Sequence, residues 1–300
     1  MKEESKILRM SVLGALGFAI LGIAWGIISQ SEMIIFDGMY SFVSLILSLI
    51  ALYISNYISK KDADKFPFGK HMLEPIVIAF KSLVIAYMCL SSFIGAIKQI
   101  VLGGNEVEYG FALVYALISV IGCGIIYFIM KRRGEKTSSE LINAESAQWL
   151  MDGLLSLAVL VGFIIASLLS KTSLSYLNKY IDPFMVVITS AFFIRVPVKT
   201  FIKSFKEIIS VKADDSINEE VYNLVKTIED EYNFEESITR VSKAGTSLRI
   251  EIDFVYNNDT NINDLDDMDC LREKLNDELK HISYKKWLSV TFTGDRKWAI

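Results

Sequence analysis

The chain has 300 residues, 52% of which are hydrophobic, and its mean hydropathy is +0.38. A soluble chain of this length can bury a core without so apolar a composition, so the excess indicates segments that contact lipid. The net charge of -4 conceals a division, because residues 1–207 carry +4 and residues 208–300 carry -8. The acidic C-terminal part argues against a nucleic-acid partner, since phosphate binding needs a basic surface.

Six apolar stretches are each at least about as long as the ~20 residues that a bilayer requires. They cover residues 8–29, 33–58, 76–99, 108–130, 145–170 and 181–203. Lys and Arg side chains are concentrated before the first stretch and after the second, fourth and sixth. The positive-inside rule therefore predicts a multi-pass protein of the inner or plasma membrane, with six transmembrane helices and both termini in the cytoplasm.

The remainder of the chain has the pattern of a small water-soluble α+β domain. Apolar spacing predicts two amphipathic helices, over residues 217–232 and 265–282, and Asp264 is placed to cap the second. Three segments alternate apolar and polar residues as strands do, over residues 237–245, 246–256 and 287–292. This order predicts an open sheet with helices on one face. We therefore predict a membrane domain over residues 1–207 and a cytoplasmic domain over residues 208–300.

Charged side chains within apolar stretches are costly in lipid and usually functional. In this chain they are Asp37, Lys81, Glu145, Asp152 and Arg195. Asp37 and Ser41 are four residues apart, as are Gln148 and Asp152, so each pair shares one face of its helix. Two helices can thus each present two oxygen donors to one cation. The alternative is that Asp37 is hydrated near the outer interface and that Asp152 is a hydrogen-bond partner between helices.

Lys81 and Arg195 lie toward the predicted cytoplasmic half of their stretches. The simpler interpretation is that their long side chains extend to the interface and keep their charges hydrated. The alternative is that one of them pairs with Glu145, because a charge buried in lipid needs a partner. Such a pair would form an inner gate that locks or releases the fifth helix.

Four segments occur in order along the chain. They are SEMIIFDGMYSFVSLILSL (31–49), FPFGKHMLEP (66–75), NAESAQWLMDGLLS (143–156) and YIDPFMVVITS (180–190). In order and spacing these segments resemble the cation diffusion facilitator family, and the resemblance covers nearly the whole chain. It implies a ferredoxin-like cytoplasmic domain, a homodimer formed through that domain, and efflux of a divalent cation driven by proton entry.

The resemblance also assigns residues and shows departures. Asp37 and Asp152 match the transport-site acids of the family, whereas Ser41 stands where Asp is usual and Gln148 where His or Asn is usual. The site is therefore an all-oxygen one, and carboxylate, carbonyl and water suit manganese and magnesium better than zinc. We expect a transported divalent cation, with manganese, magnesium, zinc, cobalt and iron not distinguished, and no permanently bound cofactor.

The Ser41 and Gln148 replacements keep a second hypothesis open. In it the chain is a non-transporting relative whose membrane part is a scaffold or a metal sensor. An enzyme is not expected, because the sequence has no Gly-rich phosphate loop, nucleophile elbow or histidine–acid constellation. The expected partners are membrane lipid, a metal cation, protons and a second copy of the chain.

Overall fold

The computed structural model describes residues 2–58, 64–67, 69–137, 140–245, 247–262, 264–282 and 284–299. Their contacts divide the chain into two compact units. The first unit comprises Met1–Leu52 and Lys81–Lys199, and the second comprises Tyr53–Phe80 and Thr200–Ile300. The domain boundary predicted at residue 207 stays a prediction.

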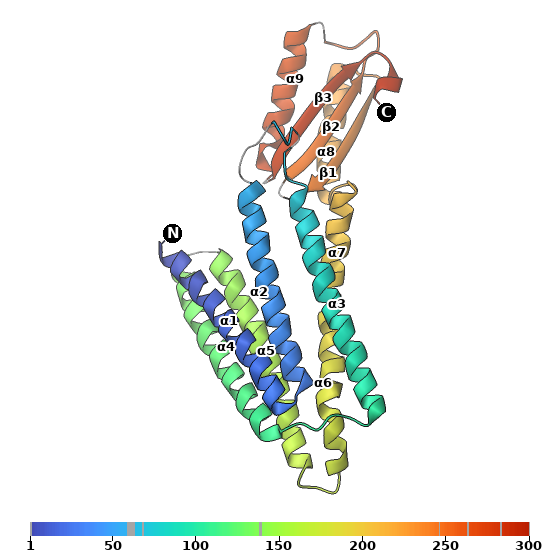
Figure 1. Ribbon diagram of the computed structural model, residues 1–300. Helices are drawn as coiled ribbons and strands as arrows, with labels where there is room; N and C mark the ends of the chain where they lie inside the picture. Colours follow the sequence, from blue (N-terminus) through green and yellow to red (C-terminus); the bar gives the residue numbers. More distant parts are fainter. Residues whose placement is uncertain are drawn as a thin grey trace. The chain divides into compact units, whose positions relative to one another are not determined.

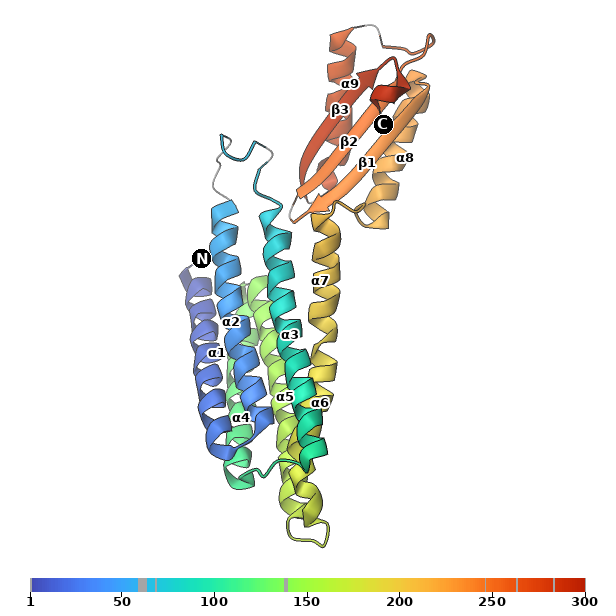
Figure 2. The same cartoon turned by 45° about the vertical axis from the view of Figure 1, so that its right-hand side comes forward.

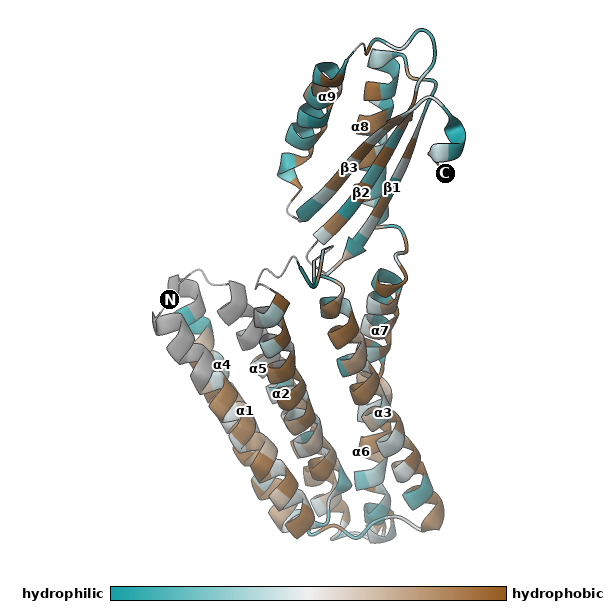
Figure 3. Cartoon of the chain, turned by 45° about the horizontal axis from the view of Figure 1, so that its top comes forward, coloured by the Kyte–Doolittle hydropathy of each residue, from teal (hydrophilic) through white to brown (hydrophobic). Residues whose placement is uncertain are grey.

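Each of the first five predicted stretches forms one long helix (Figure 1 and Figure 2). These are α1 (Lys2–Ser29), α2 (Glu32–Ile58), α3 (Leu73–Leu102), α4 (Tyr109–Thr137) and α5 (Glu140–Leu169). Many large apolar side chains point outward from them, and Leu13, Val101 and Phe128 are 68%, 80% and 63% exposed. Figure 3 shows the same apolar character along these helices. Outward-facing apolar surface of this extent is expected of helices that contact lipid.

The sixth predicted stretch, residues 181–203, is divided between two helices. A short 3₁₀ turn, η1 (Ser175–Leu177), leads into α6 (Asn178–Phe193), and α7 (Arg195–Ile208) follows after one residue. Pro197 lies four residues after Phe193 and has no N–H, so the Phe193 carbonyl loses its intrahelical donor. The sequence predicted one helix here, and the proline accounts for the interruption.

Among the described residues, five helical segments are long and apolar enough to cross a membrane. They are Met10–Ser29, Leu73–Leu102, Tyr109–Arg133, Trp149–Leu169 and Ser175–Ile208. Together they define a multi-pass helical membrane protein. The helix α2 is not one of the five, so the count of six spans stays a prediction.

The C-terminal part has the predicted order of helix, strand, strand, helix and strand. Its elements are α8 (Asp215–Tyr232), β1 (Glu236–Ala244), β2 (Ser247–Val255), α9 (Leu265–Glu278) with the 3₁₀ turn η2 (Leu279–His281), β3 (Lys285–Thr293) and the 3₁₀ turn η3 (Arg296–Trp298). The sheet order is β1-β2-β3. The strand β2 pairs antiparallel with β1, with Glu236 opposite Val255, and parallel with β3, with Ser247 opposite Lys285.

Alternating residues of β2 build the core of this part. Leu248, Ile250, Ile252 and Phe254 have no exposed surface and pack against apolar residues of α8 and α9. The two helices therefore lie on one face of the sheet, as predicted. The predicted cap of α9 is confirmed, because the Asp264 carboxylate accepts a hydrogen bond from the Asp267 N–H at 3.0 Å. The ferredoxin-like assignment stays an expectation from the family resemblance.

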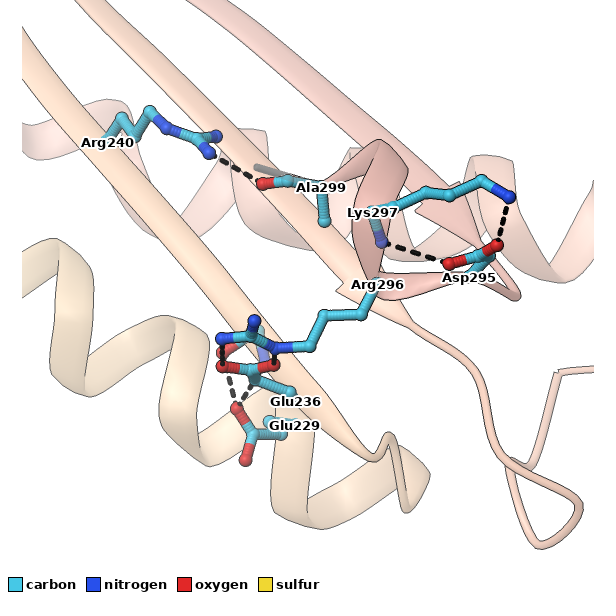
Figure 4. Close-up of polar contacts among 8 residues, drawn as sticks. Glu229, Glu236, Arg240, Asp295, Arg296, Lys297 and Ala299 are labelled. Atoms are coloured by element: carbon cyan, nitrogen blue, oxygen red, sulfur yellow. Dashed lines mark hydrogen bonds and ion pairs between the residues drawn. The ribbon is translucent and has the colours of Figure 1, made fainter.

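Polar contacts tie the end of the chain to β1 (Figure 4). Arg296 Nε donates to Glu236 Oε2 at 2.5 Å, and an Arg240 guanidinium N–H donates to the Ala299 carbonyl at 2.6 Å. Asp295 caps η3 by accepting from the Lys297 N–H at 3.0 Å. The Arg296–Glu236 contact is an exposed ion pair, and such pairs contribute little to stability, so these contacts mainly fix the path of the chain.

Candidate cation site

Three of the four residues predicted to bind a cation line one cavity of about 150 Å³ in the first unit. Asp37 and Ser41 come from α2, and Asp152 comes from α5. Gln148 lies one turn before Asp152 in α5, but its side chain is outside the part that the structure describes. The structure thus brings Asp37, Ser41 and Asp152 to one cavity, and a cation site formed by them and Gln148 stays a prediction.

The cavity is rich in oxygen. Its other polar lining residues are Ser11, Tyr40, Ser44, Ser119, Cys123, Trp149 and Ser156, contributed by α1, α2, α4 and α5. None of the described lining residues is Lys, Arg or His. The cavity has low-dielectric walls, two carboxylates and no basic side chain in its described lining. The electrostatic potential inside it therefore favours a cation.

Hydrogen bonds orient the groups around the two acids. The Tyr115 hydroxyl of α4 donates to Asp37 Oδ2 at 3.1 Å. The Ser156 hydroxyl donates to the backbone carbonyl of Asp152 at 3.0 Å, one turn back in α5. Trp149 Nε1 donates to Ser11 Oγ at 2.8 Å and joins α5 to α1 at the wall of the cavity. Side chains held in this way present fixed oxygen positions to a ligand.

The donor set limits which ions the cavity suits. Among the described residues, no group of three or more His, Cys, Asp or Glu side chains is placed to hold a metal ion. A cation between Asp37 and Asp152 would therefore complete its coordination with hydroxyl, amide or water oxygens. Magnesium and manganese accept such ligands and keep waters when bound, whereas zinc prefers nitrogen and sulfur.

The contacts of the described residues do not test the predicted inner gate. Lys81 is half-buried on α3, and Arg195 is exposed at the start of α7. Glu145 lies in α5, but its side chain is outside the described part of the chain. The gate stays a prediction.

A third acid has a role that the sequence did not reveal. Asp182 of α6 has no exposed surface and accepts from the Ser31 hydroxyl at 2.6 Å and from the Glu32 and Met33 N–H groups at 2.9 and 3.4 Å. Asn105 Nδ2 adds a contact at 3.4 Å. Asp182 thus caps the start of α2 from another helix and fixes the segment that leads to Asp37.

The sequence also missed the contribution of α4, because its cavity residues carry no charge. Tyr115, Ser119 and Cys123 are each buried beside Asp37 or the cavity. Their spacing of four residues is the only sequence signal, and in an apolar helix that spacing is common.

Comparison with known proteins identifies the family of the chain. The model of the cation efflux transmembrane domain matches residues 8–209. This match covers more than half of the chain, which therefore belongs to the cation efflux, or cation diffusion facilitator, family. With its long apolar helices, the chain is therefore a multi-pass membrane protein of this family.

Three relatives have informative names. The "Manganese efflux system protein MneP" of Bacillus subtilis is 26% identical over 196 residues, which are 65% of this chain and 65% of that protein. The "Magnetosome protein MamB" of Magnetospira sp. is 19% identical over 86% of this chain and 85% of its own length. The "Metal tolerance protein C1" of Arabidopsis thaliana is 21% identical over 85% of this chain and 55% of its own.

Proposed function

We propose that the chain exports a divalent cation of the hard class, with Mn²⁺ as the leading candidate. The observation that carries the proposal is the single cavity that Asp37, Ser41 and Asp152 line without any basic residue among its described lining. Gln148 would add an amide oxygen from the position one turn before Asp152. Manganese is favoured because the donors are oxygens and because a relative is named for manganese efflux.

Protons are the proposed counter-ions. Metal binding needs deprotonated carboxylates, so a cation that enters the cavity displaces protons from Asp37 and Asp152. If protonation occurs from the opposite side of the membrane, the same two acids couple export to proton entry. Six spans with cytoplasmic termini, and helices that rock to expose the cavity to each side in turn, complete the proposed mechanism.

Cation uptake into proteoliposomes tests this proposal. Purified protein is reconstituted with an internal metal-sensitive dye, and Mn²⁺, Zn²⁺, Mg²⁺ and Co²⁺ are compared with and without an imposed pH gradient. We expect Mn²⁺ transport that falls at least about tenfold in Asp37→Ala and in Asp152→Ala, since a tenfold loss needs only about 1.4 kcal/mol. Glu106→Ala, at an exposed acid outside the cavity, is the matched control.

The assay also separates the proposal from its rival. If no cation is carried, or if Asp37→Ala and Asp152→Ala behave like the parent, the cavity is not a transport site. The non-transporting scaffold or sensor would then be the better description. If Mn²⁺ is carried but its rate is independent of the pH gradient, export stands and proton coupling is wrong.

A further inference from the structure

One face of α4 presents three side chains to the two acids. Tyr115, Ser119 and Cys123 follow one another at intervals of four residues, so they lie on the same side of the helix. They are 5%, 2% and 5% exposed. Ser119 and Cys123 line the cavity that holds Asp37 and Asp152, and Tyr115 and Ser119 line a small adjoining cavity of about 10 Å³ that Asp37 also lines.

Ser119 points to an occupant of the cavity. Its Oγ is buried and makes no well-aligned hydrogen bond with any residue that the structure describes, although it interacts with the Tyr115 hydroxyl one turn back. A buried hydroxyl without a well-aligned partner is unfavourable, and in native proteins such groups are generally satisfied by water or by a ligand. Because Ser119 lines the same cavity as both carboxylates, a bound cation or its water is the partner that the chemistry favours.

Tyr115 acts on the acid itself. Its hydroxyl donates to Asp37 Oδ2 at 3.1 Å, which fixes the carboxylate and leaves Oδ1 to face other groups. A phenolic hydroxyl on a rigid ring orients a carboxylate with little loss of side-chain entropy. Tyr115 is therefore placed to hold Asp37 in one geometry, while Ser119, one turn further along α4, faces the space beside it.

We propose that α4 forms a third wall of the cation site, in which Ser119 supplies a hydroxyl ligand and Tyr115 positions Asp37. This inference rests on the proposed function, because it adds residues to the same site. The proposed ligands Asp37, Ser41, Gln148 and Asp152 would offer four side-chain donors, fewer than the six that Mg²⁺-like cations require. A hydroxyl from α4 and bound water would bring the set closer to that number.

Transport kinetics give the first test. We expect Ser119→Ala and Tyr115→Phe to raise the KM for Mn²⁺ roughly three- to tenfold, as the loss of one buried hydrogen bond or ligand contact predicts, with the maximal rate nearly unchanged. Ser190→Ala and Tyr87→Phe are matched controls. Ser190 is buried in α6 outside the cavity, and Tyr87 is 73% exposed on α3. A KM equal to the parent's in both α4 variants would overturn the proposal.

Cys123 gives a second readout that does not depend on transport. Its thiol lies in the cavity, so bound Mn²⁺ should slow its modification by a small thiol reagent such as methyl methanethiosulfonate, measured by mass spectrometry. The protection should disappear in Asp37→Ala. Cys270 is exposed in the C-terminal part, and its reaction should not respond to the ion.

The two readouts separate failure of this inference from failure of the proposed function. If Mn²⁺ protects Cys123 but is not carried, the α4 wall stands and export is wrong. If the parent carries Mn²⁺ while Cys123 reacts at the same rate with and without the ion, α4 is not part of the site. If the Cys123 thiol reacts neither with nor without Mn²⁺, the KM of Ser119→Ala for Mn²⁺ decides whether α4 is part of the site.

Discussion

Asp182 shows how one buried acid can control the position of another. Its carboxylate receives donors from Ser31, from the first backbone N–H groups of α2 and from Asn105, and it has no contact with solvent. The first N–H groups of a helix have no partners within that helix, so an acid from elsewhere satisfies them and sets where the helix begins. Asp37 lies little more than one turn further along α2, and its depth in the membrane follows from this anchor.

Asp182→Asn should destabilise the protein, although the side chain keeps its shape. The amide has one acceptor oxygen in place of two, so a buried donor of the α2 start loses its partner. We expect the free energy of unfolding in detergent to fall by about 1–3 kcal/mol, the cost of an unsatisfied buried group. Thermal unfolding checks this, with Glu106→Gln as the same chemical change at an exposed acid. Equal midpoints for Asp182→Asn and the parent would contradict the anchoring role.

His281 is the histidine of the C-terminal part, and it contacts an acid. Its Nε2 meets Glu220 of α8, and its Nδ1 lies 2.8 Å from the Glu278 carbonyl at the end of α9. The Glu220 hydrogen bond, helped by the Glu278 carbonyl, raises the pKa of His281 above its usual 6.5. A raised pKa in the folded state means that the contact contributes stability fully below about pH 6.5 and loses it as the pH rises through the folded-state pKa.

Glu220→Gln should lower the pKa of His281 toward 6.5, because it removes the negative charge that holds the proton. Titration of the imidazole signals by NMR measures the shift. The chain has two histidines, so a His71→Gln variant assigns the signals. Glu219→Gln, at the neighbouring exposed acid, is the control and should leave the titration unchanged. Identical titrations in Glu220→Gln and the parent would show that the contact does not form in solution.

At the scale of elements, α1 and α2 cross at closely packed glycines. A Cβ atom added to Gly38 would lie 2.6 Å from the Ile23 backbone N and 2.8 Å from the Gly22 backbone C. A Cβ atom on Gly22 would lie 2.9 Å from the Gly38 Cα. Backbone atoms cannot yield as flexible side chains do, so the crossing requires glycine on both helices. Gly38 directly follows Asp37, so the packing at this crossing also affects where Asp37 lies.

Gly38→Ala should separate α1 from α2 and displace Asp37. We expect a loss of roughly 1–3 kcal/mol of stability, as for other overpacked sites, together with a clear fall in Mn²⁺ transport. Thermal unfolding and the proteoliposome assay measure the two effects. Gly17→Ala is the matched control on α1, because a Cβ atom there meets nothing within 4 Å. Equal losses in both variants would mean that the crossing does not depend on glycine at residue 38.

The sequence predicted some of these elements better than others, for physical reasons. Long apolar runs located the helices, and the spacing of Asp37 with Ser41 predicted a face that the structure places on the cavity. The α6–α7 interruption was missed, although Pro197 was its signal. The cap by Asp182 was unpredictable, because its partners include backbone N–H groups that carry no side-chain signature. Ser119 was missed because a serine in an apolar helix is common. Unlike a charged side chain, it does not by itself indicate a functional site.

At the scale of the whole molecule, the charge of the chain bears on its assembly. Residues 208–300 carry a net charge of -8, and the family resemblance assigns dimerisation to this part. Two such domains repel one another at low ionic strength, whereas salt screens the repulsion over a Debye length of about 10 Å at 0.1 M and about 3 Å at 1 M. A dimer formed through this part should therefore become more stable, not less, as salt is added.

Light scattering of the purified chain in detergent tests this assembly. We expect a protein mass of about twice 33.8 kDa, with the dimer fraction at low protein concentration rising as the salt concentration increases. A chain ended after residue 207 should remain monomeric at every salt concentration, because it lacks the predicted interface. A full chain that is monomeric even at high salt would contradict the homodimer. A dimer that salt weakens would show instead that opposite charges hold the interface together, and the excess of acids would then lie away from it.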